Sequence, residues 1–146
     1  DLTSMAAAVG DFRPIEQSSE KIKKNGRVNI DLRLTSNPDI LAWAGAHKTA
    51  GQTLCGFAME TQDLESNAAK KLTSKHCSML VANNLNTPGA GFAVDTNVVT
   101  VLKPGETTDE PIIEHWNKMS KQELAERILT ELAALRNTES AESQAS

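Results

Sequence analysis

Continuous apolar runs of strand length occur at three places in the chain. They cover residues 2–9, 53–59 and 79–82, and such runs are typical of strands buried on both faces. Between the last two runs, residues 63–75 repeat apolar side chains at helical spacing. The order strand, helix, strand predicts a βαβ unit, in which the helix crosses one face of a parallel sheet with a right-handed connection.

Two other patterns predict strands with a different environment. Residues 28–35 alternate apolar and polar side chains, which indicates a strand with one face in water. Apolar stretches at 98–102 and 112–113 flank a turn at Pro104-Gly105, and this arrangement predicts an antiparallel hairpin.

Capping signals and periodicity predict two further helices. Asn37 followed by Pro38 favours a helix start, because Asn caps free amides and Pro is tolerated at the first helical position; this helix should end near Ala46. Ser120 and Glu123 form the S-x-x-E pattern of a capping box. Apolar residues at helical spacing follow it: Leu124, Ile128, Leu129, Leu132 and Leu135.

The last residues and the overall pattern set the domain organisation. Residues 136–146 are small and polar, so they cannot offset the entropy of ordering, and we predict a disordered tail. The 146-residue chain fits one domain. Together the elements predict an α/β, Rossmann-like three-layer fold with a mostly parallel sheet and one antiparallel hairpin.

Composition excludes several function classes. Lys and Arg number 15 against 19 Asp and Glu, so a formal charge of −4 gives no general attraction to nucleic acid or to an anionic membrane. Aromatic residues are only 3% of the chain, too few for a surface that stacks bases. Neither a spanning helix of about 18 apolar residues nor a signal sequence is visible. Cys55 and Cys77 lack CxxC spacing, so we expect core thiols in a cytoplasmic protein.

The helix predicted at 63–75 has two lysines on its apolar stripe. Lys71 and Lys75 share this side with the apolar residues, whereas Lys70 points the other way. Their alkyl stems could pack on the core with the ammonium groups in solvent. Alternatively, they meet an anion at the carboxyl end of the 53–59 strand, where α/β sheets bind ligands.

A second group of cations lies in a polar segment without an apolar face. Lys21, Lys23 and Lys24 fall within four residues there, and they form either a solvated surface loop or a flap that closes over a polyphosphate. Asp11 directly follows a predicted buried strand. It could bind a ribose hydroxyl or a divalent ion, or serve only as a turn residue.

Several other chemistries lack their signatures. His47, His76 and His115 are widely spaced without a metal-ligand pattern, and neither a P-loop nor G-x-G-x-x-G occurs. A metalloenzyme, a Walker site and an NAD-type Rossmann protein are therefore not supported. Asp95, Thr96 and Asn97 lie in a Gly-rich loop and could line a site, although we favour a turn.

Seven motifs in a fixed order carry a family resemblance. They are AAAVGDFRP, EKIKK, NPDIL, GFAMET, VANN, GFAVDTNVVT and MSKQELAERIL, with the two helix lysines between GFAMET and VANN. From residue 2 to about residue 135, the chain resembles the ligase domain of bacterial phosphopantothenoylcysteine synthetases. Two mild departures are Gly10 and Met59, which stand where small residues or Ala are common.

This resemblance implies a reaction in two steps. CTP activates the carboxylate of 4′-phosphopantothenate as an acyl-cytidylate, and the amine of L-cysteine then displaces CMP. Mg²⁺ is implied as the companion of CTP, and a homodimer as the assembly. FMN is not expected, because the flavin-binding decarboxylase often fused upstream is absent.

The resemblance also implies that residues 1–135 are the C-terminal part of that ligase domain. The Gly-rich strand-loop-helix that opens the family's domain, and an Asn that handles the acyl intermediate, are not present in this sequence. An isolated copy is then expected to be inactive or incomplete in catalysis. The alternative is a nucleotide-binding module or remnant that retains the pocket without the chemistry.

Position by position, the resemblance assigns CTP contacts and one catalytic residue. Lys21, first lysine of the EKIKK motif, matches a flap lysine implicated in turnover of the intermediate, and Asp11 is the candidate for Mg²⁺. The implied CTP-binding residues are Met5, Ala6, Ala7, Asp11, Lys21, Asn37, Pro38, Asp39, Ile40, Phe57, Lys71 and Lys75.

Overall fold

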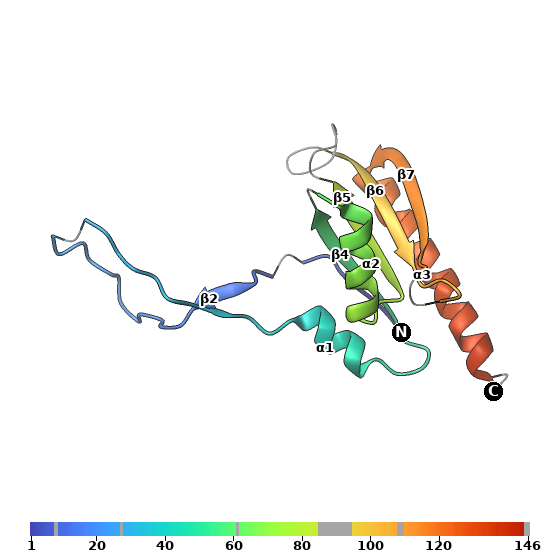
Figure 1. The fold of residues 1–146 in the computed structure, drawn as a ribbon, viewed down its shortest axis with the longest axis horizontal. Coiled ribbons are helices and arrows are strands. Elements are labelled where there is room, and N and C mark those ends of the chain that lie inside the picture. The colour runs from blue at the N-terminus through green and yellow to red at the C-terminus, as the bar shows by residue number, and fades with distance from the viewer. Residues whose placement is uncertain (8, 27, 61, 85–94, 108–109, 145–146) are drawn as a thin grey trace. The chain divides into compact units, whose positions relative to one another are not determined.

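Strands and helices are distributed over two units of the chain (Figure 1). The computed structural model describes residues 1–7, 9–26, 28–60, 62–84, 95–107 and 110–144. One unit comprises residues 1–6 and 41–146, and the other residues 7–40. In chain order the elements are β1 (Leu2–Met5), β2 (Phe12–Pro14), β3 (Leu34–Ser36), α1 (Ile40–His47), β4 (Thr53–Glu60), α2 (Leu64–Ser74), β5 (Met79–Asn84), β6 (Thr96–Lys103), β7 (Ile112–Ser120) and α3 (Lys121–Gln144).

The larger unit is built on a five-stranded sheet with the order β1-β4-β5-β6-β7. β4 is parallel to β1 and β5, whereas β6 is antiparallel to β5 and β7. Only β6 therefore runs against the other four strands, which confirms the predicted α/β fold with a mostly parallel sheet and a hairpin. The end of the sheet at which β1, β4 and β5 finish is called the carboxyl edge below.

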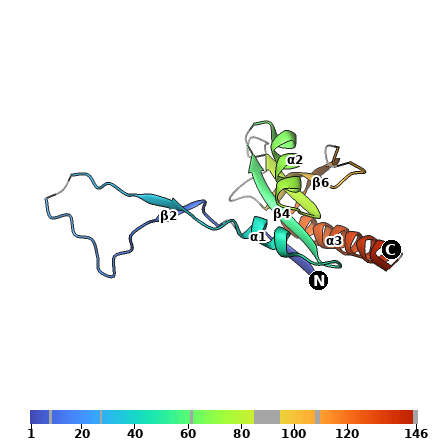
Figure 2. The same cartoon turned by 60° about the horizontal axis from the view of Figure 1, so that its bottom comes forward.

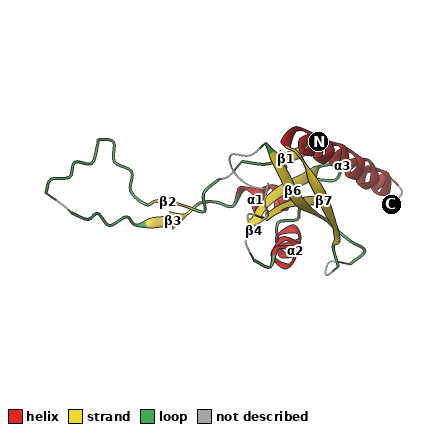
Figure 3. Ribbon diagram, turned by 90° about the horizontal axis from the view of Figure 1, so that it is seen from above, coloured by secondary structure: helices red, strands yellow, loops and turns green. Residues whose placement is uncertain are grey.

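Helices cover both faces of this sheet (Figures 2 and 3). Leu54 and Ala58 of β4 pack in the cluster that contains α2, whereas Cys55 packs in the cluster that contains α3. β4 is thus buried on both sides, as its continuous apolar run predicts. Cys55 and Cys77 are free buried thiols, and burial raises the pKa of Cys55 to about 12.

The start and the apolar face of α3 agree with the sequence. Glu123 accepts hydrogen bonds from the backbone N–H and the hydroxyl of Ser120, both at 2.8 Å, and the Glu123 N–H donates to Ser120 Oγ at 3.1 Å. These contacts confirm the capping box. Three residues of the predicted stripe are buried, and a fourth packs against them: Leu124, Ile128, Leu132 and Leu135.

The far end of α3 differs from the sequence prediction. The helix continues to Gln144, whereas the apolar stripe predicts an end near Leu135. Residues after the stripe have ordinary helix propensity even without a buried face, and the Thr138 hydroxyl donates to the carbonyl of Ala134 at 3.0 Å. The helix end was thus placed too early. Disorder of residues 136–146 in solution stays a prediction.

Two of the predicted strands are shorter and more exposed than their patterns indicate. β1 ends at Met5 instead of residue 9 and is largely exposed, because β4 is its only strand neighbour in the described part of the chain. In the smaller unit, β3 includes only the end of the 28–35 stretch and pairs with β2. Val28 is 96% exposed, so the predicted strand with a buried face is wrong there. A two-stranded hairpin offers too little surface for a core of its own.

None of the helices within the described residues is long and apolar enough to cross a membrane.

An ion-pair network connects β6, β7 and α3. Lys103 Nζ contacts carboxylate oxygens of Glu114 and Glu131, and Trp116 Nε1 donates to Glu114 Oε2 at 2.9 Å. The hydrogen bond from Lys103, followed by that from Trp116, lowers the pKa of Glu114 below its ordinary value. The network thus stabilises the charged form of this carboxyl group in the folded protein.

Replacing Glu114 with Gln should make stability less dependent on pH in the acid range. Because the folded pKa of Glu114 is lowered, its contribution is present above its unfolded pKa and is lost as pH falls through the folded pKa. The group is partly exposed, so we expect a loss of roughly 0.5–1 kcal/mol at pH 7 that disappears at lower pH. Urea unfolding at several pH values measures it, with Glu106→Gln as the matched control. A deficit that persists unchanged in acid would contradict the prediction.

Candidate functional site at the carboxyl edge

Side chains from β4 and α2 meet at the carboxyl edge of the sheet. Glu60 is the last residue of β4, and its Oε1 atom lies 2.8 Å from the ammonium nitrogen of Lys71. The Asn67 amide donates to Glu60 Oε2 at 3.4 Å and to the carbonyl of Gln62 at 3.1 Å. The Glu60 side chain is only 14% exposed, whereas that of Lys71 is 44% exposed.

The apolar stripe of α2 explains how Lys71 reaches this edge. Ala68 and Leu72 are buried against the sheet, and Lys71 lies between them in sequence on a helix that begins soon after β4 ends. The long lysine side chain leans toward the N-terminal end of its helix, which is the end near the carboxyl edge. The predicted orientation of Lys71 is confirmed by its contact with Glu60. Binding of a phosphate there stays a prediction.

Lys75 lies one turn further along the chain, at the C-cap of α2. Its backbone is about 6 Å further from the carboxyl edge than that of Lys71 along the helix axis. Gly45 of α1 approaches here so closely that an added Cβ would lie 1.9 Å from the Lys75 carbonyl oxygen. The structure thus separates the backbones of the two predicted lysines, and a role of Lys75 in CTP binding stays a prediction.

Three more predicted site residues lie near the carboxyl edge in the larger unit. Met5 ends β1 opposite Gly56 in parallel register, and Ala6 follows it. Met5 packs against the core cluster on the α2 face, and Phe57 against the cluster on the α3 face. Lys71 and Phe57 therefore approach the end of the sheet from opposite faces.

In the smaller unit, Asn37 joins the two ends of the hairpin. Its side-chain amide donates to the carbonyl of Gly10 at 2.6 Å, and its backbone N–H donates to the carbonyl of Asp11 at 2.8 Å. Arg13 Nη1 donates to Asn37 Oδ1 at 3.0 Å. Asn37 is thus not the predicted helix cap, since α1 begins at Ile40 and the Asn37 side chain has these other partners. Sequence reasoning did not identify Arg13 as a partner of Asn37.

The remaining predicted residues of the smaller unit are placed but not brought into a cluster. Asp11, Pro38, Asp39 and Ile40 are exposed around the hairpin ends, and Ala7 is exposed beyond β1. Lys21 is exposed in the segment between β2 and β3, where the structure has no helix or strand in the described residues.

Sequence reasoning missed Glu60 and Asn83 at this edge, where an amide pair joins β5 and β6. The Asn97 side-chain amide donates to Asn83 Oδ1 at 3.1 Å, and its own oxygen accepts from the Val98 N–H at 3.0 Å. Asn97 is only 8% exposed and lies in β6, so the turn favoured for 95–97 is wrong at this residue. Asn83 pairs with Met59 near the end of β4. Polar residues directly after a buried run, such as Glu60 and Asn83, were the signal available in the sequence.

The described residues contain no cluster of metal ligands, and a cavity among them is not lined by the predicted site residues. Among the described residues, no group of three or more His, Cys, Asp or Glu side chains could hold a metal ion. A cavity of about 360 Å³ lies at the opposite end of the sheet, where α2 ends and the β6–β7 loop begins, and none of the predicted site residues lines it. Its lining includes Lys48, Thr73, His76, Cys77, Gly105 and Thr107.

Fold and edge define an α/β protein with a cation presented at the carboxyl ends of parallel strands. More particularly, the chain belongs to the family described as DNA/pantothenate metabolism flavoprotein C-terminal domain, which matches residues 1–135.

Curated relatives match most of this chain but are much longer. The coenzyme A biosynthesis bifunctional protein CoaBC of Bacillus subtilis (strain 168) is 42% identical over 137 residues, which cover 92% of this chain and 32% of that protein. A cysteine/cysteine sulfinic acid decarboxylase from an unknown prokaryotic organism is 39% identical over 136 residues, which cover 92% of this chain and 36% of that protein. The chain thus spans about a third of the length of these relatives.

Solved structures share the fold. The crystal structure of the C-terminal domain of CoaBC superposes with a TM-score of 0.69 at 28% identity, covering 94% of this chain and 56% of that one. A Cab2 mutant in complex with phosphopantothenate-cysteine gives a TM-score of 0.65 at 20% identity. The match covers 95% of this chain and 45% of the Cab2 chain. The second likeness concerns the fold alone.

Proposed function

We propose that this chain belongs to a ligase that joins 4′-phosphopantothenate to L-cysteine with CTP. The carboxylate attacks the α-phosphorus of CTP and releases pyrophosphate, and the cysteine amine then attacks the acyl-cytidylate, loses a proton and releases CMP. The observation that carries the proposal is the half-exposed side chain of Lys71 at the carboxyl edge, in a chain whose relatives include CoaBC proteins of coenzyme A biosynthesis. α/β sheets bind ligands at this end of their strands.

Under this proposal, the site residues divide into two groups. Lys71 contacts the phosphates, while the backbone after Met5 and the ring of Phe57 border the nucleotide at the ends of β1 and β4. Lys75 adds a second cation. Asp11, Asn37 to Ile40 and Lys21 contribute from the smaller unit, with Lys21 acting where charge develops during acyl transfer.

The donor set is compatible with Mg²⁺ that is bound chiefly through substrate phosphates. Mg²⁺ typically uses one or two carboxylates together with phosphates and water, so it needs no cluster of protein ligands. Asp11 is exposed and would supply one carboxylate. When bound, the ion would neutralise charge on the triphosphate.

We propose that the chain forms a homodimer with a second copy of itself. Ile30 and Leu32 are 60% and 63% exposed, and with Val28 they occupy alternate positions of one stretch. Exposed apolar side chains gathered in one stretch are typical of a surface that a partner protein covers. Sedimentation of the chain should then give a species of twice 15.7 kDa, and a monomer at every concentration would contradict the dimer.

A nucleotide-binding module is the second candidate function. It is favoured by the Lys71 ammonium at the carboxyl edge, since such a cation can hold an anion without any chemistry. Such a module would bind CTP and release no pyrophosphate.

Pyrophosphate release separates the two candidates. The chain is incubated with CTP, Mg²⁺ and 4′-phosphopantothenate, and control reactions omit one component at a time or replace CTP with ATP. Release that requires both CTP and phosphopantothenate supports the ligase. Saturable CTP binding without release identifies the module, and the absence of both binding and release would contradict both candidates.

A further inference from the structure

We infer that Glu60 is a positioning residue that holds the Lys71 ammonium at the carboxyl edge, ready to meet a phosphate group. This inference rests on the proposed function, because it concerns the same anion site. It assigns Glu60 no contact with the substrate. Its effect is transmitted through Lys71.

Glu60 is suited to this role by the rigidity of its surroundings. Glu60 pairs with Asn84 at the end of the β4–β5 ladder, which fixes its backbone on the β5 side. The carboxylate is held on both oxygens, since Lys71 contacts Oε1 and Asn67 donates to Oε2. A group fixed in this way can impose one position on a flexible partner.

The pair leaves the ammonium group available to a ligand. A lysine ammonium has three N–H donors, and the contact with Glu60 uses one of them. The other two can donate to phosphate oxygens. Because the lysine side chain is ordered before a ligand binds, the free energy of binding does not include the entropy cost of ordering it.

Repulsion between the Glu60 carboxylate and a phosphate opposes this effect. The exposures of the two side chains indicate which effect dominates, since the carboxylate is 14% exposed and the lysine 44%. An anion arriving from solvent therefore meets the ammonium first. Exposed ion pairs contribute little by themselves, but this carboxylate is mostly covered and has a second donor.

The first test needs no ligand. Acetylation by acetic anhydride, followed by peptide mass spectrometry, measures the reactivity of Lys71 in the unaltered chain and in Glu60→Gln and Glu60→Asp variants. The neighbouring Lys70, which is exposed, is the internal control. We expect Lys71 to react more slowly than Lys70 in the unaltered chain and several-fold faster in Glu60→Gln. Equal Lys71 reactivity in all three proteins would overturn the inference.

The second test uses inorganic pyrophosphate as the probe in calorimetric titrations of the same proteins, with circular dichroism to confirm folding. We expect roughly 3- to 10-fold weaker binding by Glu60→Gln, since the remaining hydrogen bond holds the ammonium less firmly. Glu60→Asp should also weaken binding, because the shorter side chain draws the ammonium back. Lys70→Gln should bind within about twofold of the unaltered chain, as expected for an exposed charge.

The outcomes separate this inference from the proposed function. Tighter binding by Glu60→Gln would show that repulsion dominates, and an unchanged Glu60→Asp would show that charge alone matters; either result overturns the positioning role. If Lys71→Met abolishes binding while the Glu60 variants bind normally, only the inference fails. If the unaltered chain binds neither pyrophosphate nor CTP, the proposed function fails with it.

Discussion

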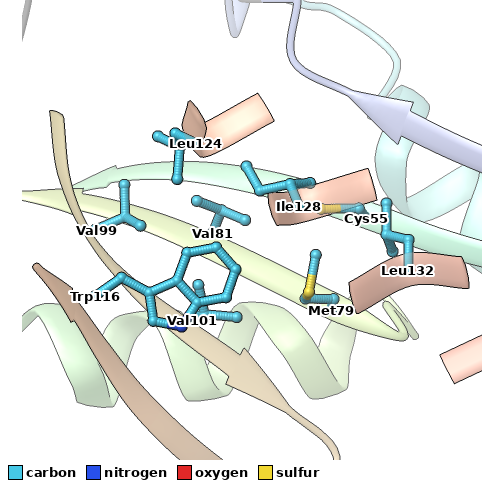
Figure 4. Close-up of a cluster of buried hydrophobic side chains, with 9 residues drawn as sticks. All are labelled: Cys55, Met79, Val81, Val99, Val101, Trp116, Leu124, Ile128 and Leu132. Atoms are coloured by element: carbon cyan, nitrogen blue, oxygen red, sulfur yellow. The ribbon is translucent and has the colours of Figure 1, made fainter. Parts of the chain in front are cut away.

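Replacing Leu132 with alanine should lower the free energy of unfolding by about 2–5 kcal/mol. Leu132 is 1% exposed and contributes from α3 to the cluster that includes Met79 and Cys55 (Figure 4). Truncation removes apolar atoms from this cluster and leaves a cavity, and the neighbouring strands are held by ladders on both sides and can collapse little.

Leu129 on the same helix gives the matched control. It is 55% exposed, so Leu129→Ala should change the free energy of unfolding by less than about 0.5 kcal/mol. Urea unfolding followed by circular dichroism measures both variants, and the midpoint should shift without a change in slope. Similar losses for the two variants would mean that α3 does not pack on the sheet as the structure shows.

Periodicity predicted the larger unit well because burial there follows the pattern directly. The continuous run of β4 is covered on both faces, and the helical stripe of α3 places Leu132 on the buried side, although Leu129 of the same predicted repeat is exposed. In each case the residues that cover the apolar side chains belong to the same unit. A local pattern then reports the tertiary environment correctly.

The same reasoning failed where the described chain supplies no covering surface. Residues 28–34 alternate as a half-buried strand does, yet their apolar side chains are exposed and only Leu34 enters β3. Alternation identifies an apolar face without specifying what packs on it. β1 is a second example. Its apolar sequence predicts a strand buried on both faces, yet among the described residues it has only β4 as a strand neighbour.

Only part of the candidate site was accessible from sequence. The stripe of α2 was enough to orient Lys71, since helix geometry fixes which residues share a face. The contacts of Lys71 with Glu60 and of Asn97 with Asn83 depend on how separate elements are placed against one another. Asn37 was misassigned for the same reason, because its partner Gly10 is distant in sequence.

In an enzyme that performs the proposed reaction with this chain, replacing Lys21 with Gln should reduce turnover far more than CTP binding. We expect turnover to fall by about 10²–10³-fold, the usual effect of removing one donor that stabilises charge in an acyl-transfer transition state. CTP affinity should fall only modestly, because other cations, including Lys71, also contact the phosphates in the proposed site. A charge contributes most where negative charge develops during the reaction.

Steady-state kinetics and a parallel CTP titration test this expectation for Lys21. Lys118→Gln, which removes an exposed charge from β7, is the matched control and should leave both quantities nearly unchanged. A large loss of turnover with a small loss of affinity assigns Lys21 to the chemical steps. If affinity and turnover fall equally, Lys21 contributes uniform binding alone, and the segment between β2 and β3 then acts on the nucleotide without a catalytic lysine.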